Sequence, residues 1–438
     1  MNPVIAPRFA QRYLAWFAGG LVLLLGIVAA GNRLVDPEGV FYTPTLDAVN
    51  AVRLRARGDR VAKAAEVARG NYDTLLAGSS RVMVGLDPKN PALAAYRAYN
   101  LGLNETNMQE QADVMAFARG HNELELVIWG LDFLMFSDRR GYSQDYADSQ
   151  FAGHGFAAVA SRYLLSMDTT IGSVETIAHN LAGEAAKPVP WVTHGGFRKT
   201  ALSEVPPRKQ FRDILAKGFF VGPGLYLKFR YSPERMALLA RETDALAGSG
   251  TKVVLFVPPV HARQLEAIRV MGLWPVYERW LADLAALADQ HADTDRVTVW
   301  NFSGYTDVTT EPVPGENILD TVLDGYWESS HYKPALGSRL LCTVLDTACS
   351  VEALPGETLS TATLPRILSD METGRVAYLS EQPGEAEEVF RLCEQTAGRK
   401  HGTVCIRPPT LRMAGRLTSD RLTPLNSSRL PGLRLGHD

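Results

Sequence analysis

The chain has 438 residues, of which 46% are hydrophobic and 21% charged, and its formal net charge at pH 7 is −3. This length allows one large core with appended segments, or two domains. The hydrophobic share excludes a largely disordered protein, and the nearly balanced charge argues against a nucleic-acid partner, which would favour a basic chain. We therefore expect a globular protein that binds no nucleic acid.

The N-terminal segment differs from this average. Residues 13–31 contain no charged side chain, and a helix of that length, at about 1.5 Å rise per residue, covers roughly the 30 Å hydrocarbon core of a bilayer. Arg8 and Arg12 precede the apolar run, which predicts a cytoplasmic N-terminus (1–12) and a single-pass protein of the inner membrane with a periplasmic main domain. A cleaved signal peptide is the alternative, because residues 28–30 have the small side chains of a cleavage site. In both interpretations the rest of the chain is exported.

Apolar runs and helical periodicity alternate beyond a segment, residues 32–70, that we predict to be a stalk. Strands are predicted over residues 74–77, 96–101, 124–129, 252–257 and 297–302. Helices are predicted over residues 108–119, 233–247 and 262–290, and a last helix runs from beyond His331 to Leu345. Continuous apolar strands separated by helices are typical of a parallel sheet covered on both faces. We therefore predict an α/β domain over residues 71–345, with residues 137–231 inserted between the third and fourth strands.

The C-terminal part has weaker patterning. We predict an irregular extension over residues 346–400 and a flexible tail, rich in proline, over residues 401–438. The four cysteines lie in the last quarter of the chain, and they are Cys342, Cys349, Cys393 and Cys405. They allow three disulfide pairings, with buried free thiols as the alternative, and we favour disulfides that staple a poorly cored region of an exported protein. The sequence has no metal-ligand cluster and no phosphate-binding loop, so no metal and no cofactor are expected.

Two short segments carry residues suited to acyl transfer. The first predicted strand breaks at Gly78 and is followed by Ser79, Ser80 and Arg81. A serine that opens a helix lies near free N–H groups, which can stabilise an alkoxide or an oxyanion, so Ser80 is a candidate nucleophile. The alternative is an ordinary loop with a helix N-cap. Arg81 could bind an anionic glycan or cover the edge of the sheet.

The second segment follows the last predicted strand. His331 lies three residues after Glu328 and just before a predicted helix. An imidazole there could take the proton of Ser80, and the carboxylate could hold its other ring nitrogen. The alternative is a solvated histidine in a loop. We interpret His261, after the fourth strand, as a structural hydrogen-bonding residue.

In this order the two segments resemble the SGNH (GDSL-like) hydrolase and acyltransferase superfamily. Its nucleophile follows the first strand and its Asp-x-x-His follows the last, which implies Ser80 as nucleophile, His331 as base and Glu328 in place of the aspartate. Ser79 replaces the family's Gly-Asp-Ser aspartate, as in membrane-anchored branches resembling the teichoic-acid D-alanylation and alginate O-acetylation proteins. Gly102 would match the oxyanion glycine of the second block. The resemblance implies a three-layer, flavodoxin-like parallel sheet.

The third block of the family departs from the pattern. It reads Gly-x-Asn-Asp in the family, whereas this chain has Gly130-Leu131-Asp132-Phe133, with a carboxylate at the position of the amide donor. An ionised Asp132 would repel a developing oxyanion. The side chain must therefore be protonated, point elsewhere, or mark a loss of activity.

The resemblance implies a periplasm-facing serine acyltransferase or esterase. It would add or remove acyl esters, chiefly acetyl, on an envelope or exported polysaccharide. Water as acceptor makes the protein an esterase, and a sugar hydroxyl makes it a transferase, for which the resemblance implies a membrane-bound O-acyltransferase partner. The alternative, supported by Asp132, is a catalytically inactive SGNH-like binding or scaffold subunit of a polysaccharide export or modification complex.

Overall fold

The fold is organised around a mostly parallel six-stranded sheet. The computed structural model describes residues 5–54, 58–183, 191–200, 205–222, 225–316, 318, 322–347 and 349–409. The strands lie in the order β2-β1-β3-β6-β7-β8, and only the β7–β8 pair is antiparallel. They are β1 (Thr74–Ser79), β2 (Ala98–Leu103), β3 (Leu126–Gly130), β6 (Lys252–Val257), β7 (Val297–Asn301) and β8 (Glu357–Thr358). The predicted mixed α/β class and the five predicted strands are confirmed; β8 was not predicted.

Helices cover both faces of this sheet. Successive strand residues alternate between two cores: Leu75 and Ala77 join the larger core, and Leu76 joins the smaller one. The helices over the larger core are α2 (Asp59–Arg69), α4 (Met108–His121), α8 (Pro233–Gly248), α9 (Ala262–Val270) and α10 (Trp274–Asp289), and those over the smaller one are α3 (Ser80–Gly85) and α11 (Pro334–Leu345). Both faces of the strands are therefore buried, which explains why the strands read as continuous apolar runs.

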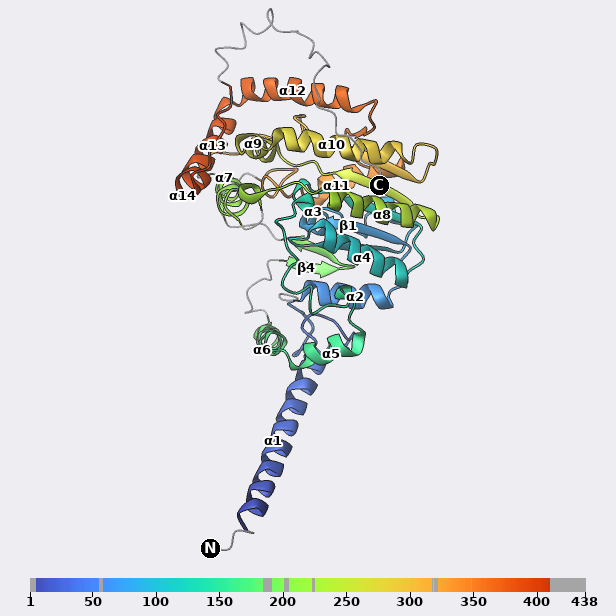
Figure 1. Ribbon diagram of the computed structural model, residues 1–438, viewed down its shortest axis with the longest axis vertical. Coiled ribbons are helices and arrows are strands. Elements are labelled where there is room, and N and C mark those ends of the chain that lie inside the picture. The colour runs from blue at the N-terminus through green and yellow to red at the C-terminus, as the bar shows by residue number, and fades with distance from the viewer. Residues whose placement is uncertain are drawn as a thin grey trace, which may run out of the picture.

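Helix α1 (Ile5–Val35) projects from one end of the body (Figure 1). Among the described residues it is the one helix long and apolar enough to cross a membrane. Its side chains are exposed from Phe9 to Ile27. Its last turn is attached to the body, because the buried Asn32 side chain donates hydrogen bonds to Leu164 O and Thr170 Oγ1, both at 2.9 Å.

Two helical segments differ from the sequence prediction. The predicted stalk contains α2, whose Ala64 and Val67 are fully buried in the larger core, so this helix belongs to the domain. The predicted helix over residues 262–290 is two helices, α9 and α10. They are separated at Gly272, which has φ +72°, a conformation that glycine adopts without a Cβ penalty.

The C-terminal extension is regular and well packed, contrary to our expectation. It forms α12 (Leu364–Glu381), α13 (Pro383–Cys393), the π-helical turn η7 (Glu394–Gly398) and α14 (Arg399–His401). Ile367 and Val389 join the larger core. The four cysteines form the disulfides Cys342–Cys349 and Cys393–Cys405, as we favoured over free thiols, and the structure selects this pairing from the three that the sequence left open. Residues 410–438 of the predicted tail lie outside the described residues.

The insertion between β3 and β6 contributes to several separate parts of the molecule. It contains α5 (Phe156–Leu165), α6 (Met167–Ala182), the hairpin β4 (Trp191–His194) and β5 (Phe197–Thr200), and α7 (Pro207–Asp213). Short turns are η1 (Pro91–Leu93), η2 (Phe133–Phe136), η3 (Gln150–Ala152), η5 (Ile214–Phe219) and η6 (Tyr226–Lys228). Helices α5 and α6 pack against α1, and the hairpin turn accepts a hydrogen bond from the edge strand, Asn100 N to Gly195 O at 2.9 Å. Two parts of the insertion reach loops that follow the strands: Asn107, after β2, donates from Nδ2 to Gly141 O at 2.7 Å, and the Phe211 ring lies 5.0 Å from that of His261.

Candidate active site

Ser80, His331 and Glu328 meet at the carboxyl end of β1. Ser80 is the first residue of α3, directly after the strand, and the other two lie in the loop before α11. The Nε2 atom of His331 is 2.7 Å from Ser80 Oγ, and its Nδ1 atom is hydrogen-bonded to Glu328 Oε1. Residues separated by most of the domain thus form one hydrogen-bonded chain, in the arrangement of a nucleophile, a base and an orienting carboxylate.

The environment of Glu328 keeps its carboxylate ionised. Burial alone would raise its pKa, but the charge and hydrogen bond of His331 and the backbone N–H of Ser330, at 2.8 Å, outweigh burial and lower the pKa below the usual value. An ionised carboxylate can only accept hydrogen bonds, so it holds the imidazole proton on Nδ1. The lone pair of Nε2 is then directed at the hydroxyl of Ser80, as a general base requires.

The loop that carries His331 is fixed from several sides. Tyr326 and Tyr332 form an antiparallel bridge that closes the turn, and both rings are buried. Tyr326 also donates from its hydroxyl to Pro259 O at 2.9 Å. In the middle of the turn, Ser329 O accepts the N–H of His261 at 3.1 Å. The imidazole is therefore positioned by a braced loop and not by a freely rotating side chain.

His261 has the structural role predicted for it. Its Nδ1 accepts the N–H of Arg263 at 3.2 Å and caps α9, and its Nε2 donates to Glu311 O at 2.8 Å. Complete burial lowers the pKa of His261 to about 3, so the ring is neutral at physiological pH. The side chain of Glu311 accepts the N–H of Gly325 at 3.0 Å and supports the start of the loop that carries His331.

Asp132, the position that departed from the family pattern, is engaged in a buried network. Its Oδ1 is 2.6 Å from Arg81 Nη1, and its Oδ2 accepts the hydroxyl of Ser79. Burial alone would lower the pKa of Arg81, but the Asp132 carboxylate outweighs burial and raises it, so the guanidinium is charged. Arg81 Nε also donates to Ser330 O at 2.9 Å. The ion pair with Arg81 was not among the three possibilities considered from the sequence.

Gly102 has a different role from the predicted oxyanion contact. Its N–H donates to Asn100 Oδ1 at 2.9 Å, so this group is already used within the protein. A Cβ atom at Gly102 would lie 2.4 Å from Met83 N, which shows that glycine is needed for the close packing of α3 on β2. The N–H of Ser80 is the better donor to an oxyanion, because the first N–H groups of a helix have no partner within it.

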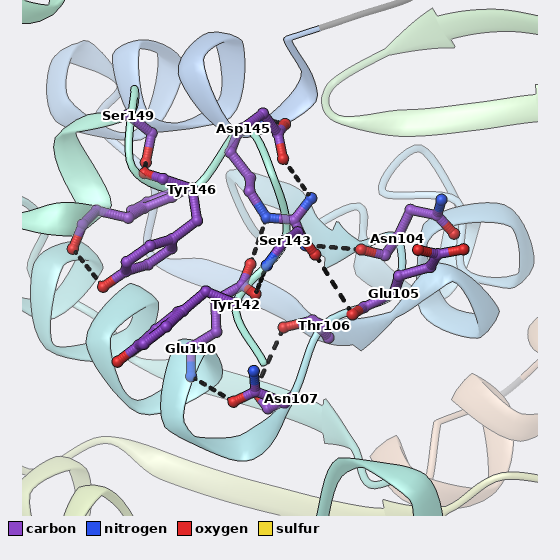
Figure 2. Close-up of polar contacts among 12 residues, drawn as sticks. Asn104, Glu105, Thr106, Asn107, Glu110, Tyr142, Ser143, Asp145, Tyr146 and Ser149 are labelled. Carbon is purple, nitrogen blue, oxygen red and sulfur yellow. Dashed lines mark hydrogen bonds and ion pairs between the residues drawn. The ribbon is translucent and has the colours of Figure 1, made fainter. Parts of the chain in front are cut away.

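The loop after β2 borders the site, and a network that we did not predict holds it. Ser79 is paired with Leu103, so residues 104–107 begin beside Ser80. The buried Arg60 side chain donates from Nη2 to Asn104 O at 2.6 Å and forms ion pairs with Glu110 and Asp145. Figure 2 shows this network, in which Ser143 and Asp145 approach the loop from the inserted region. The only sequence signal was basic residues within an amphipathic helix.

Lys63, one turn after Arg60, supports the adjacent end of β2. Its Nζ donates to Asn100 O at 3.2 Å and to Gly102 O at 2.5 Å. Burial lowers the pKa of Lys63 to about 8, and this is the largest influence on it. Arg60 and Lys63 thus replace the hydrogen bonds that β2 carbonyls and the following loop would otherwise make with water.

Little enclosed space lies beside the Ser80, His331 and Glu328 side chains. A cavity of about 20 Å³ lies beside Arg81 and Asp132 and is also lined by Tyr226 and Gln264. That volume suits a single water molecule and no acyl chain. The His331 side chain is 25% exposed, so an acyl donor must approach from the solvent side. Within the described residues no group of histidine, cysteine and acidic side chains could hold a metal ion.

Comparison with known proteins does not add to this geometry. No family model matches the chain, and no characterised protein matches it in sequence. The functional argument therefore depends on the site itself.

Proposed function

We propose that this protein is an SGNH-like serine esterase or acyltransferase. The observation that carries the proposal is the hydrogen-bonded chain from Ser80 through His331 to Glu328. The strand order supports it: the five parallel strands, β2-β1-β3-β6-β7, follow the 2-1-3-4-5 order of flavodoxin-like sheets. In such sheets ligands bind at the carboxyl ends of the strands, which is where the three residues lie.

The chemistry follows from the roles of these groups. Ser80 Oγ attacks the carbonyl carbon of an acyl ester while His331 Nε2 takes its proton, and the Ser80 N–H binds the developing oxyanion. The C–O bond to the leaving alcohol then breaks, and His331 returns the proton to that oxygen. In the second half, water or a sugar hydroxyl attacks the acyl-serine while its proton passes to His331. The bond between the acyl carbon and Ser80 Oγ then breaks, and His331 returns the proton to Ser80 Oγ. Hydrolysis or transfer results, depending on the acceptor.

Two observations support an exported, membrane-anchored enzyme. Both cysteine pairs are disulfide-bonded, and disulfides persist in oxidising compartments such as the periplasm. Helix α1 continues without a break through the possible cleavage site at residues 28–30, and Asn32 directly beyond it is buried against the body. These features favour a retained anchor in the inner membrane, with the N-terminus in the cytoplasm. An envelope polysaccharide as acceptor and a membrane-bound O-acyltransferase as acyl source follow from the resemblance.

The rival function, an inactive scaffold subunit, depended on Asp132. Its ion pair with Arg81 removes most of the repulsion that an isolated carboxylate would exert on an oxyanion. The geometry therefore favours the enzyme over the scaffold.

Fluorophosphonate labelling of the full-length chain in detergent tests the proposal. We expect a covalent adduct on Ser80, loss of that adduct in Ser80→Ala, and its retention in Ser79→Ala, whose hydroxyl is bonded to Asp132 and not to His331. Absence of labelling in a wild-type protein with both disulfides formed would favour the scaffold. Where labelling succeeds, the products of 4-nitrophenyl acetate with and without an oligosaccharide distinguish transfer from hydrolysis.

A further inference from the structure

Helix α6 has its polar and apolar faces reversed relative to a helix of a soluble domain. Such a helix normally buries an apolar stripe and exposes polar residues. The buried residues of α6 are Thr169, Gly172, Ser173 and Thr176, all small or polar. Ser173 donates from its hydroxyl to Asn32 Oδ1 at 2.9 Å, so this polar face contacts the last turn of α1.

The opposite face of α6 is an exposed apolar stripe. Its members recur at intervals of three or four residues, which places them on one side of the helix. The stripe consists of Met167 (73% exposed), Ile171 (41%), Val174 (63%), Ala178 and Leu181 (68%). A continuous apolar face of this kind marks a surface that another apolar phase covers.

The position of α6 identifies that phase. Figure 1 shows α5 and α6 at the end of the body from which α1 emerges. The charge-free part of α1 ends at Gly31, and the next residue, Asn32, is the one that α6 contacts. If α1 crosses a bilayer, Asn32 lies just beyond the hydrocarbon core, in the interfacial layer where polar side chains are hydrated. Helix α6 is therefore held at that depth by its own hydrogen bonds.

We propose that the apolar stripe of α6 lies in the outer interfacial layer of the bilayer crossed by α1 and forms a second membrane contact. This depends on the anchor and not on the serine chemistry. One contact through a single helix would leave the domain free to rotate about that helix. A second contact beside it restricts this rotation, so that Ser80 is presented in one orientation relative to the membrane.

The charges of α6 define the kind of lipid surface. The helix contains no lysine or arginine, and its two acidic residues, Asp168 and Glu175, are exposed. Interfacial helices that depend on anionic lipids carry basic residues on the polar face. The contact therefore results from burial of apolar side chains, and it should form on zwitterionic phosphatidylcholine without help from anionic lipid.

A single-cysteine labelling experiment on the full-length chain tests this. The four native cysteines are paired, so an introduced thiol can be labelled selectively with an environment-sensitive fluorophore. The probe site is Val174→Cys. The matched control is Val376→Cys on α12, which is similarly exposed at 55% and lies at the opposite end of the body (Figure 1). Leu23→Cys in α1 reports insertion of the anchor.

Each protein is reconstituted into phosphatidylcholine nanodiscs that contain a lipid spin-labelled at the head group. We expect the probe at position 174 to be blue-shifted and quenched at least about twofold more than the probe at position 376, as for a shallowly buried side chain. Equal quenching at the two positions, with the Leu23→Cys probe buried in lipid, would overturn the proposal while leaving the anchor intact. Protection at position 174 in native membranes but not in nanodiscs would overturn it in favour of a protein partner. Labelling of Ser80 by a fluorophosphonate reports independently on the proposed enzyme.

Discussion

Replacement of Arg81 by methionine would test the network around Asp132. The guanidinium is 2.6 Å from the Asp132 carboxylate, and the two side chains are only 7% and 8% exposed. Methionine is similar in length but carries no charge, so the substitution leaves the buried Asp132 carboxylate with the Ser79 hydroxyl but without its cationic partner. Removal of one member of a buried pair costs about 3–5 kcal/mol. With an unfolding entropy of about 2 cal/mol/K per residue over roughly 350 ordered residues, the midpoint should fall by about 4–7 °C.

Thermal unfolding of the full-length chain in detergent, followed by tryptophan fluorescence, measures this loss. Asp132→Asn alone should also destabilise the protein, because it leaves the buried Arg81 guanidinium without an anionic partner. The double variant Arg81→Met/Asp132→Asn removes both charges, so we expect it to recover much of the loss. Fluorophosphonate labelling should fall in every variant that lacks Arg81, because Arg81 Nε also supports the loop that carries His331 by donating to Ser330 O.

Additive destabilisation in the double variant would refute this reasoning. Additivity means that the two side chains do not interact, and the carboxylate would then be free to act on the site as an isolated charge. A single variant Arg81→Met with unchanged unfolding temperature would contradict it equally, because the ion pair would then make no net contribution.

Three further predictions concern the catalytic loop, pH dependence and the disulfides. In Glu328→Gln, an amide replaces the acceptor-only carboxylate, so the rate of fluorophosphonate labelling should fall on the order of 10⁴-fold, whereas a rate near wild type would exclude an orienting role. The pKa of His261 is lowered to about 3 in the folded state, so below about pH 6.5 only the unfolded state binds this proton. The free energy of unfolding should therefore fall by about 1.4 kcal/mol for each unit by which the pH is lowered from 6.5 to 4.5. Unfolding of His261→Asn, which can still cap α9, should have a shallower pH slope over that range, and an unchanged slope would assign the effect to other groups. The Cys393–Cys405 disulfide joins residues with a sequence separation of 12, so Cys393→Ser/Cys405→Ser should lower the free energy of unfolding by about 3 kcal/mol. Denaturant unfolding with and without reductant would check this loss, with the reduced wild type as the comparison.

The sequence alone determined the features that depend on local patterning. The charge-free run of residues 13–31 predicted a long apolar helix, and continuous apolar strands predicted a parallel sheet with both faces covered. The position of Ser80 after the first strand and of His331 after the last parallel strand also followed from chain order. Parallel strands place their carboxyl ends at one edge, so these residues could be expected to meet.

Only the tertiary structure decided which polar groups pair with one another. The neutralisation of Asp132 by Arg81, the use of the Gly102 N–H by Asn100 and the reach of Arg60 to the loop after β2 depend on distances between separate elements. The burial of the polar face of α6 could not be predicted either, because periodicity shows that a helix has two faces but not which of them is buried. Pairing of side chains and choice of buried face are set by the neighbours that folding brings together, and a linear pattern of residue types does not contain those neighbours.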